Sequence, residues 1–395
     1  MKAAYVYGPE AMDIRDIPTP IPGRGEALIE IIYAGVCGSD ITMYRGQHPT
    51  ARLPVVLGHE IFGIVRKISG GTECVGRFDS ADRASGVNGA NGACGVNGTD
   101  GANGAGGVKG TDGANGAGGV NGTEDANGIR VGDKVAAEPL LSCGVCEACM
   151  QGFGNVCGKL RIIGLHENGA YAQFVKVGVG KLVKIKTGIP DKLAALAEPF
   201  GVAYHVCMRG NLRGGEDALI IGAGPIGNIV AVMARAFGAN VVVSEPNHIR
   251  RATAEKLGFA TYDPVGGDEG TLLSAASGGA GFDVVFEASG SKAGILSTTR
   301  LCKIHGVIVP LALASAPVDF VLGQVSFKEQ TVVGTRVYPF LHYKRGVEML
   351  ERLYADGVQL DPLVSDILPL HEAQKAIDMM INGENACKIL LDARV

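Results

Sequence analysis

Four cysteines lie close together in the stretch CGVCEACMQGFGNVC and have the spacing C-x2-C-x2-C-x7-C. Thiolates on a short irregular lobe can surround Zn²⁺ tetrahedrally and leave no open position, so a site of this kind is structural. The alternatives are four incidental cysteines, a redox pair or an iron–sulfur cluster, although the C-x3-C-P ending of bacterial ferredoxin motifs is missing. The spacing favours a structural zinc held by Cys143, Cys146, Cys149 and Cys157.

A glycine-rich turn of the form G-x-G-x-x-G follows an apolar run and precedes a helical pattern, which is the context that a dinucleotide motif needs. In that setting Gly222 permits the tight turn, Gly224 the close approach of a pyrophosphate, and Gly227 the packing of helix on strand. The helix that begins at Pro225 and Ile226 offers unpaired N–H groups and a partial positive charge to the diphosphate. The turn therefore predicts a dinucleotide site.

An acidic residue, Glu245, follows the next apolar run, where a dinucleotide-binding fold presents a carboxylate to the adenosine ribose. We expect Glu245 to accept hydrogen bonds from the ribose diol and to repel the 2′-phosphate of NADP, which favours NAD. Arg250 and Arg251 come shortly afterwards and either soften that preference or flank the adenine. The alternative for Glu245 is a solvated charge at a strand end.

Three further places carry groups suited to a catalytic zinc, namely Cys37 in GVCGSD, His59 and Glu60 in GHE, and Glu198 in AEPFGVAYH. A thiolate, an imidazole and a carboxylate leave Zn²⁺ an exchangeable position for water or an alcohol. Each alone is weak evidence, because a single buried Cys or His usually belongs to a core. Their combination with the thiolate cluster and the glycine turn is far more specific.

The joint pattern resembles the zinc-containing medium-chain dehydrogenases, and the polyol, butanediol and threonine dehydrogenase branch in particular. The resemblance covers nearly the whole chain except a Gly-X-Y insert. It implies an α/β protein in which both chain ends form a GroES-like, β-rich catalytic domain and a doubly wound Rossmann coenzyme domain lies between them. The implied divisions are 1–185 and 330–395 for the catalytic domain, 186–329 for the coenzyme domain, 70–128 for the insertion and 140–160 for the structural zinc lobe.

The resemblance also implies roles for single residues. Cys37 and His59 are expected on the catalytic zinc, Glu60 as a ligand or exchangeable ligand, and Glu198 close to the metal or its water. Ser39 matches the hydroxyl that connects the substrate oxygen to a proton relay. The implied cofactors are two Zn²⁺ per chain and NAD, with NADP less favoured.

Two departures from the family pattern stand out. Many relatives have a histidine three residues after the position of Ser39, whereas this chain has Thr42. We expect the relay to run through Thr42, the ribose or water, with assistance from His48 if its loop folds inward. The insert precedes the stretch VGDKV, where relatives have a short turn, so the fold should stay intact.

The elements that must position these residues can be read from the apolar pattern. The first third of the chain holds short β-type runs such as 27–33 and 62–68, separated by Gly and Pro, and predicts a β-rich domain. Around the glycine turn the pattern changes to strand, turn, helix and strand, which predicts a βαβ unit. Further strands are expected at 283–287 and 306–313, before a final β run and two helices.

The insert has a strict period. Between Gly86 and Gly122 every third residue is Gly, and near-copies of a twelve-residue unit begin at Val96, Val108 and Val120. A collagen triple helix also needs abundant proline, and this segment has none. Because Gly, Ala, Asn and Asp bury too little apolar area to offset their ordering entropy, we expect a flexible surface loop that proteases cut first.

The composition narrows the class of partner. With 395 residues, 46% hydrophobic and 19% charged, the chain is expected to form two globular domains. A net charge of −4 without a Lys/Arg cluster argues against nucleic acid. The N-terminus does not match a signal peptide and no apolar run matches a membrane span, so we expect a cytoplasmic protein whose cysteines serve metals rather than disulfides.

These features predict an enzyme that transfers a hydride between NAD and a secondary alcohol or its ketone, with a small polyol or diol as the favoured substrate and a homodimer or homotetramer as the assembly. A threonine or amino-alcohol dehydrogenase, including one for aminocyclitols, shares every motif. A zinc-independent enoyl or quinone reductase would not need the three catalytic ligands together. From another class, a non-catalytic NAD-binding scaffold stays open, and metal content would separate it. Candidate residues for substrate specificity are Tyr44, Phe200 and Arg336.

Overall fold

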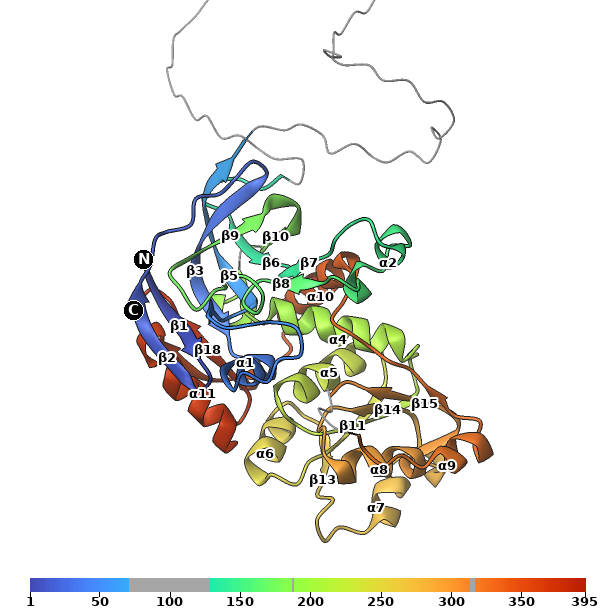
Figure 1. Cartoon of the computed structure of the whole chain (residues 1–395). Coiled ribbons are helices and arrows are strands. Elements are labelled where there is room, and N and C mark those ends of the chain that lie inside the picture. Colours follow the sequence, from blue (N-terminus) through green and yellow to red (C-terminus); the bar gives the residue numbers. More distant parts are fainter. Residues whose placement is uncertain (71–127, 187, 313–316) are drawn as a thin grey trace, which may run out of the picture.

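The computed structural model describes residues 1–70, 128–186, 188–312 and 317–395. Figure 1 shows a β-rich region that holds both chain termini and a layered α/β region beside it. The helices α4 (Ala197–Arg209) and α10 (Phe340–Ala355) pack against each other where the two regions meet. Within the described residues, no helix is both long and apolar enough to cross a membrane.

The β-rich region is built around β3 (Glu26–Gly35), which pairs antiparallel with β5 (Glu60–Ser69) and β9. Alternate residues of a strand point to opposite faces, and Ala27, Ile29 and Ile31 of β3 accordingly lie in the core. The other strands of this region are β1 (Lys2–Gly8), β2 (Ala11–Asp16), β4 (Val55–Val56), β6 (Lys134–Ala137), β9 (Phe174–Gly178), β10 (Leu182–Lys184), β17 (Val364–Pro369) and β18 (Lys388–Asp392).

The second region has a six-stranded parallel sheet in the order β13-β12-β11-β14-β15-β16. Every residue of the central strand β11 is buried, as a parallel strand covered on both faces requires. The chain order reverses beside β11, and ligands of such sheets bind at the carboxyl ends of the strands at that point. The strands are β11 (Asp217–Ile221), β12 (Asn240–Ser244), β13 (Ala260–Tyr262), β14 (Phe282–Glu287), β15 (Cys302–Pro310) and β16 (Thr331–Val332).

Helices cover the parallel sheet and close the β-rich region. α5 opens at the glycine turn and connects β11 to β12, which confirms the predicted βαβ unit and the predicted fold class. Besides α4 and α10, the helices are α1 (Gly38–Tyr44), α2 (Glu147–Met150), α3 (Asp191–Ala194), α5 (Pro225–Ala236), α6 (His248–Lys256), α7 (Glu269–Ser274), α8 (Lys292–Leu301), α9 (Leu322–Phe327) and α11 (Ala373–Asn382).

The two ends of the chain meet in one sheet. β18 pairs antiparallel with β3 and parallel with β17, so the last residues of the chain complete the sheet that the first residues begin. The edge strand β16 joins the parallel sheet although it begins at Thr331, after the implied division at residue 329. The exact division between the domains stays a prediction.

The Gly-X-Y segment expected to be a flexible loop, 86–122, lies outside the described residues. The strands on either side of it, β5 and β6, pair antiparallel, with Ile64 opposite Lys134. The chain therefore leaves and re-enters the sheet at the same end. A short turn at this point would connect the two strands equally well.

Candidate active site

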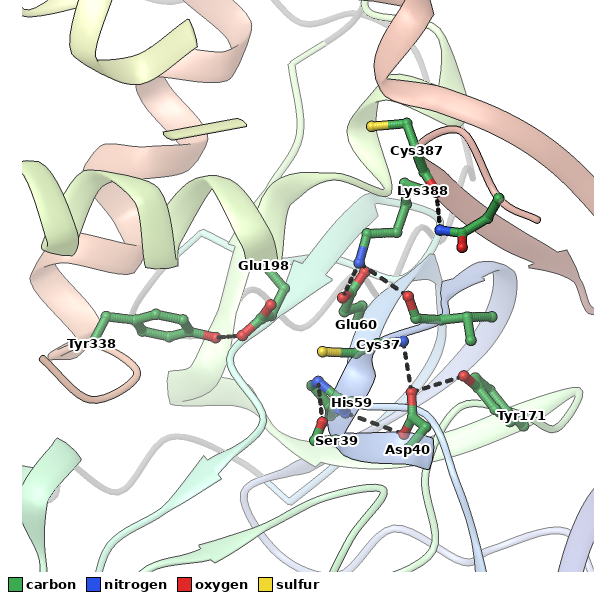
Figure 2. A network of polar contacts seen from close by, with 12 residues as sticks. Cys37, Ser39, Asp40, His59, Glu60, Tyr171, Glu198, Tyr338, Cys387 and Lys388 are labelled. Atoms are coloured by element: carbon green, nitrogen blue, oxygen red, sulfur yellow. Dashed lines mark hydrogen bonds and ion pairs between the residues drawn. The ribbon is translucent and has the colours of Figure 1, made fainter. Parts of the chain in front are cut away.

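Three of the predicted catalytic ligands converge on one point. The ligand atoms of Cys37, His59 and Glu60 all lie within 4.8 Å of one another. Cys37 is the residue before α1, and Glu60 is the first residue of β5, so the two motifs arrive from different elements. Figure 2 shows the thiol, the imidazole and the carboxylate facing a common space.

Glu60 is held by a lysine from the far end of the chain. The Lys388 ammonium donates to Glu60 Oε1 at 2.6 Å and to the Val36 carbonyl oxygen at 3.1 Å. Burial alone would lower the pKa of Lys388, but the charges of Glu60 and Cys37 outweigh it and raise that pKa. The carboxylate fits here only because residue 35 is glycine, since a Cβ at Gly35 would lie 1.8 Å from Glu60 Oε2.

His59 is oriented by a buried carboxylate. Its Nδ1 faces Asp40 Oδ1 at 3.5 Å, and the other Asp40 oxygen accepts from the Tyr171 hydroxyl at 2.8 Å and from the Cys37 N–H at 2.9 Å. Burial would lower the pKa of His59, yet Asp40 and Cys37 raise it well above its ordinary value. The surroundings therefore favour a positive charge at this place, and the Asp40 contact leaves His59 Nε2 to face the cluster.

Glu198 lies near the cluster but outside the group of three. It is in the first turn of α4, and its Oε1 accepts a hydrogen bond of 2.7 Å from the Tyr338 hydroxyl. Burial raises the pKa of Glu198 to about 7, with His59 lowering it and Glu60 raising it. The Glu198 carboxyl group is thus close enough to interact electrostatically with His59 and Glu60. Figure 2 shows it on the side of these ligands opposite Asp40.

The predicted relay residues are on and after α1. Ser39 Oγ lies 3.5 Å from His59 Nε2, at the edge of the ligand cluster. Thr42 Oγ1 contacts the Gly38 carbonyl oxygen at 3.4 Å, one turn back on the same helix. His48 Nδ1 accepts from the backbone N–H of Ala51 at 2.9 Å, which fixes the loop. Within the described residues, no hydrogen bond connects His48 to Ser39.

The donor set fits a zinc ion. Glu60 Oε2 is buried and has no hydrogen-bond partner among the described residues, although it faces a thiol and an imidazole. An unpartnered buried carboxylate oxygen is costly, and a cation among these three donors would satisfy it. Sulfur, nitrogen and oxygen donors with a free position match the ligand sets of catalytic zinc.

The cysteine cluster has the geometry of a closed zinc site. The sulfur–sulfur distances are 3.5 Å for Cys146 to Cys149, 3.8 Å for Cys146 to Cys157 and 3.9 Å for Cys143 to Cys149. A tetrahedron with Zn–S bonds of about 2.3 Å has edges of about 3.8 Å. Backbone N–H groups lower the pKa of Cys143 to about 6, which prepares a thiolate. The lobe is closed at its base by β7 (Leu140–Leu141) and β8 (Arg161–Ile162).

The glycine turn has the geometry that the motif predicts. Gly222 has φ +103°, and a Cβ on Gly227 would lie 1.9 Å from the Gly222 carbonyl oxygen. A Cβ on Gly224 would meet nothing within 4 Å, so the backbone there is open to a ligand. Pro225 and Ile226 form the first turn of α5.

Glu245 lies against the turn rather than in solvent. Its carboxylate accepts from the Ala223 N–H at 2.7 Å and from the Asn247 N–H at 2.8 Å. Arg251 is occupied by the Glu245 carbonyl oxygen at 2.7 Å and by Asp263 at 3.1 Å. Arg250 reaches Asn385 Oδ1 at 3.3 Å, in the last segment of the chain, and thereby connects the two regions.

Four residues that the sequence analysis did not single out complete the site. Except for the contact of Asp40 with the Cys37 N–H, their side-chain partners lie far away in the sequence, so local spacing carries little information on them. A weak signal was nevertheless present, because a lone lysine opens the apolar run KILLD and an aspartate follows Ser39 in the Cys37 motif. These residues are Asp40, Tyr171, Tyr338 and Lys388.

Comparison with known proteins identifies the family. Residues 225–352 match the family described as zinc-binding dehydrogenase, and residues 23–86 and 90–187 match the alcohol dehydrogenase GroES-like domain. The chain is 30% identical to the 2-dehydro-3-deoxy-L-galactonate 5-dehydrogenase of Pseudoalteromonas atlantica, over 99% of this chain and 98% of that protein. It is 32% identical to the L-galactonate-5-dehydrogenase of Escherichia coli, over 80% of this chain and 77% of that protein.

A solved structure agrees with these matches. A protein of Sinorhizobium meliloti 1021, described as a zinc-binding dehydrogenase and crystallised with NADP, superposes with a TM-score of 0.77 at 25% identity. The match covers 99% of this chain and 98% of that one. The chain therefore belongs to the zinc-containing medium-chain dehydrogenases and is a zinc-type alcohol or polyol dehydrogenase.

Proposed function

We propose that the protein is an NAD-linked enzyme that interconverts a secondary alcohol of a small polyol, diol or related polyhydroxylated compound with its ketone. The observation that carries this proposal is the convergence of Cys37, His59 and Glu60 beside the hydroxyl of Ser39. Two relatives named for galactonate derivatives support a polyhydroxylated substrate. The cysteine lobe would hold a second, structural zinc.

The catalytic zinc would be held by Cys37, His59 and Glu60, with Glu198 nearby as a further ligand or a partner of water. It would supply Lewis acidity, which makes a hydroxyl group easier to deprotonate. Ser39 would receive the substrate's hydroxyl proton, and the position of its Oγ, 3.5 Å from His59 Nε2, supports this role. The proton would then leave through the ribose of a bound coenzyme or through water, because the hydrogen bond of Thr42 Oγ1 within the described residues goes to the Gly38 carbonyl oxygen.

The surrounding residues keep this arrangement in one geometry. Asp40 faces His59 Nδ1 at 3.5 Å, and the Tyr171 hydroxyl donates a hydrogen bond to the other Asp40 oxygen. Lys388 occupies one oxygen of Glu60 and leaves the other to the cluster. Such supporting contacts fix ligand orientation and tune a metal site.

The coenzyme would be NAD, which provides the hydride acceptor. The turn formed by Gly222, Gly224, Pro225, Ile226 and Gly227 offers backbone N–H groups to the diphosphate at the start of α5. A carboxylate beside that turn favours the ribose diol and repels a 2′-phosphate. Neither neighbouring arginine is free to offset this repulsion, since one is bound to Asp263 and the other to Asn385.

Turnover and metal content test the proposal together. The purified protein should contain two zinc ions per chain and reduce NAD with at least one member of a panel of polyols, diols, amino alcohols and L-threonine. Cys37→Ser should lose turnover and one zinc while keeping NADH affinity, whereas Cys302→Ala, at a buried cysteine outside both clusters, should keep all three. Full turnover of Cys37→Ser would contradict the proposal.

The alternatives give different results in the same experiment. A strong preference for L-threonine would change the proposed substrate class from a polyol to an amino alcohol and leave the assigned site residues as they are. One zinc per chain and no turnover on any substrate would support the non-catalytic NAD-binding scaffold. Each alternative function therefore predicts its own combination of zinc content and substrate turnover.

The assembly would be a homodimer or homotetramer. Phe327 is 92% exposed and Leu322 is 70% exposed, both on α9, the helix that precedes the edge strand β16 in the chain. Exposed apolar side chains beside a free sheet edge are features of a contact between copies. Light scattering after size exclusion should give a dimer or tetramer, and Phe327→Asp should shift it toward the monomer; a wild-type monomer would contradict the assembly.

A further inference from the structure

Four basic side chains from three separate segments gather beside the candidate active site. His48 and Arg52 belong to the loop after α1, His166 to the loop between β8 and β9, and Arg336 to the segment between β16 and α10. The sequence separates these segments by more than a hundred residues each. Their meeting is therefore a product of the fold.

The contacts between these segments are direct. The His48 and His166 rings meet edge to face with centroids 5.6 Å apart, and Thr50 Oγ1 lies 3.1 Å from His166 Nε2. Burial lowers the pKa of both histidines, and the charge of Arg336 lowers each of them further, as Arg52 does for His48. Both guanidinium groups are thus within electrostatic reach of the ring pair.

The two arginines have no acidic partner among the residues that the structure describes. Arg52 donates a hydrogen bond to the neighbouring Ala51 carbonyl oxygen. Neither arginine forms an ion pair with a carboxylate in the part of the chain that the structure describes. By contrast, the nearby Arg161 is paired with Glu167 at 2.8 Å. Two unneutralised guanidinium groups at one place leave a positive potential that an anion would relieve.

The imidazoles present donors to the same place. His48 Nδ1 accepts from the Ala51 N–H at 2.9 Å, and His166 Nδ1 accepts from the Ile162 N–H at 3.2 Å. In the neutral ring the other nitrogen, Nε2, then carries the proton. His166 Nε2 meets Thr50 Oγ1 at 3.1 Å, so the cluster combines two cations with one N–H donor that has no partner among the described residues, that of His48. The neighbouring carboxylate, Glu167, is paired with Arg161.

Each segment is fixed next to a different catalytic residue. The loop with His48 and Arg52 follows the helix that carries Ser39. The loop with His166 contains Gly164, where a Cβ would lie 2.8 Å from the His59 nitrogen. Arg336 is two residues before Tyr338, which donates to Glu198. Three independent anchors thus place the cluster beside the metal ligands.

There is room for part of a ligand at this place. His48 and Arg52 line a cavity of about 240 Å³ together with Met43 and Gly46. Met43 is on α1, one turn after Ser39. This cavity therefore adjoins the cluster on the side of the loop after α1.

We infer that Arg52 and Arg336, with His48 and His166, bind the carboxylate of a sugar acid whose secondary alcohol is oxidised at the Cys37, His59 and Glu60 cluster. The inference rests on the proposed function and names its substrate class. Paired guanidinium groups match the planar geometry of a carboxylate, which they hold with charge-assisted hydrogen bonds. Neutral polyols would lack this interaction.

The test compares aldonic acids with the matching alditols, which differ only in the terminal carboxylate. The wild-type enzyme should prefer the best aldonate by about 100-fold in kcat/KM, the size expected of two charge-assisted hydrogen bonds. Arg52→Met combined with Arg336→Met should remove about that factor for the aldonate, mainly through KM, and should weaken the alditol, which has no carboxylate, far less. Calorimetric titration of the aldonate into the NADH-loaded enzyme should show the same loss of affinity without turnover.

Arg213→Met is the matched control. Arg213 is exposed and unpaired within the described residues, but it precedes β11 at the amino end of the parallel sheet, away from the coenzyme site. Both kcat/KM and aldonate affinity should stay unchanged in this variant. An equal loss in the control would show that net charge alone matters and would overturn the inference.

The outcomes separate the inference from the proposed function. If no aldonate or alditol is oxidised, the proposed function fails first. If alditols are oxidised as well as aldonates, or the double variant weakens both equally, the carboxylate site is wrong while the dehydrogenase assignment stands. A preference for a sugar phosphate over the matching aldonate would likewise overturn the assignment of a carboxylate.

Discussion

Lys388 Nζ lies 2.6 Å from Glu60 Oε1, and both side chains are almost fully buried. This pair connects the last strand of the chain to the GHE motif and so ties the sheet built from both chain ends to the candidate metal site. A buried charge is tolerated only when it is paired. Lys388 therefore occupies one oxygen of Glu60 and leaves Oε2, which has no hydrogen-bond partner among the described residues, for a cation.

Removing the lysine tests this relationship. Lys388→Met should lower the free energy of unfolding by about 3–5 kcal/mol, because it leaves the Glu60 carboxylate buried without its partner. Adding Glu60→Gln should recover part of the loss, since the unpaired charge disappears. Urea denaturation of the two variants measures both effects.

An exposed ion pair serves as the control for Lys388. Lys375→Met removes the partner of Glu372, a pair on the surface of α11. Such pairs contribute about 0–1 kcal/mol. A Lys388→Met effect no larger than that of Lys375→Met would contradict the role given to the buried pair.

The carboxylate beside the glycine turn should decide between NAD and NADP. Glu245→Gln keeps a hydrogen-bond acceptor for the Ala223 N–H but removes the charge that repels a 2′-phosphate. The ratio of NADPH to NADH dissociation constants should fall about tenfold, or 1.4 kcal/mol. Fluorescence titration with both coenzymes measures the ratio. An unchanged ratio, as expected for the control Glu255→Gln on α6, would contradict the selectivity assigned to Glu245.

A histidine pair should make folding stability depend on pH. His205 Nδ1 lies 2.8 Å from His342 Nδ1, and burial followed by the charge of His342 lowers the pKa of His205 to about 4 from 6.5. A depressed pKa means that the unfolded chain binds more protons, so this stability is fully present above pH 6.5 and is lost as pH falls toward 4. The effect should amount to about 1–2 kcal/mol between pH 7.5 and 5.

His205→Gln should flatten that dependence. The comparison is the free energy of unfolding at pH 7.5 and at pH 5 for the wild type, for His205→Gln and for His248→Gln. The last variant changes an exposed histidine at the start of α6 and should behave as the wild type. Equal slopes in all three proteins would show that the histidine pair does not govern the acid response.

The insertion should be dispensable for folding. β5 and β6 pair antiparallel on either side of it, so replacing 71–127 by a turn of a few residues keeps their register. Loop-closure entropy changes only slowly with length, so the melting temperature and kcat/KM should stay close to those of the full chain. Limited proteolysis of the full chain should cut first within 86–122. Loss of the folded state after excision would contradict this expectation.

The sequence predicts those parts of the site that are contiguous along the chain. The cysteine spacing, the glycine turn and the Cys37 and GHE motifs each carry their chemistry within a few residues, and the structure brings the predicted ligands together. The two long-range supports, Lys388 and Tyr338, have no such signal, because their partners are set by sheet pairing and helix packing. The basic cluster of His48, Arg52, His166 and Arg336 has no local sequence signal either, because its three segments come together only in the folded protein.

The division between domains shows a further limit. β16 begins at Thr331 and joins the parallel sheet, although a short β run at this place looks the same in sequence whichever sheet it joins. Arg250 is a similar case. Its position after Glu245 suggests the coenzyme, while the fold offers it Asn385 from the opposite end of the chain. Pairing partners of short polar or β-type segments are decided by tertiary contacts, which a local pattern does not encode.

The most direct test of the account is anomalous X-ray diffraction at the zinc absorption edge from crystals of the purified protein. It should show two peaks per chain, one surrounded by Cys143, Cys146, Cys149 and Cys157 and one at the common point of Cys37, His59 and Glu60. A single peak in the cysteine lobe, with zinc present in excess, would contradict the central claim that the second group holds a catalytic metal.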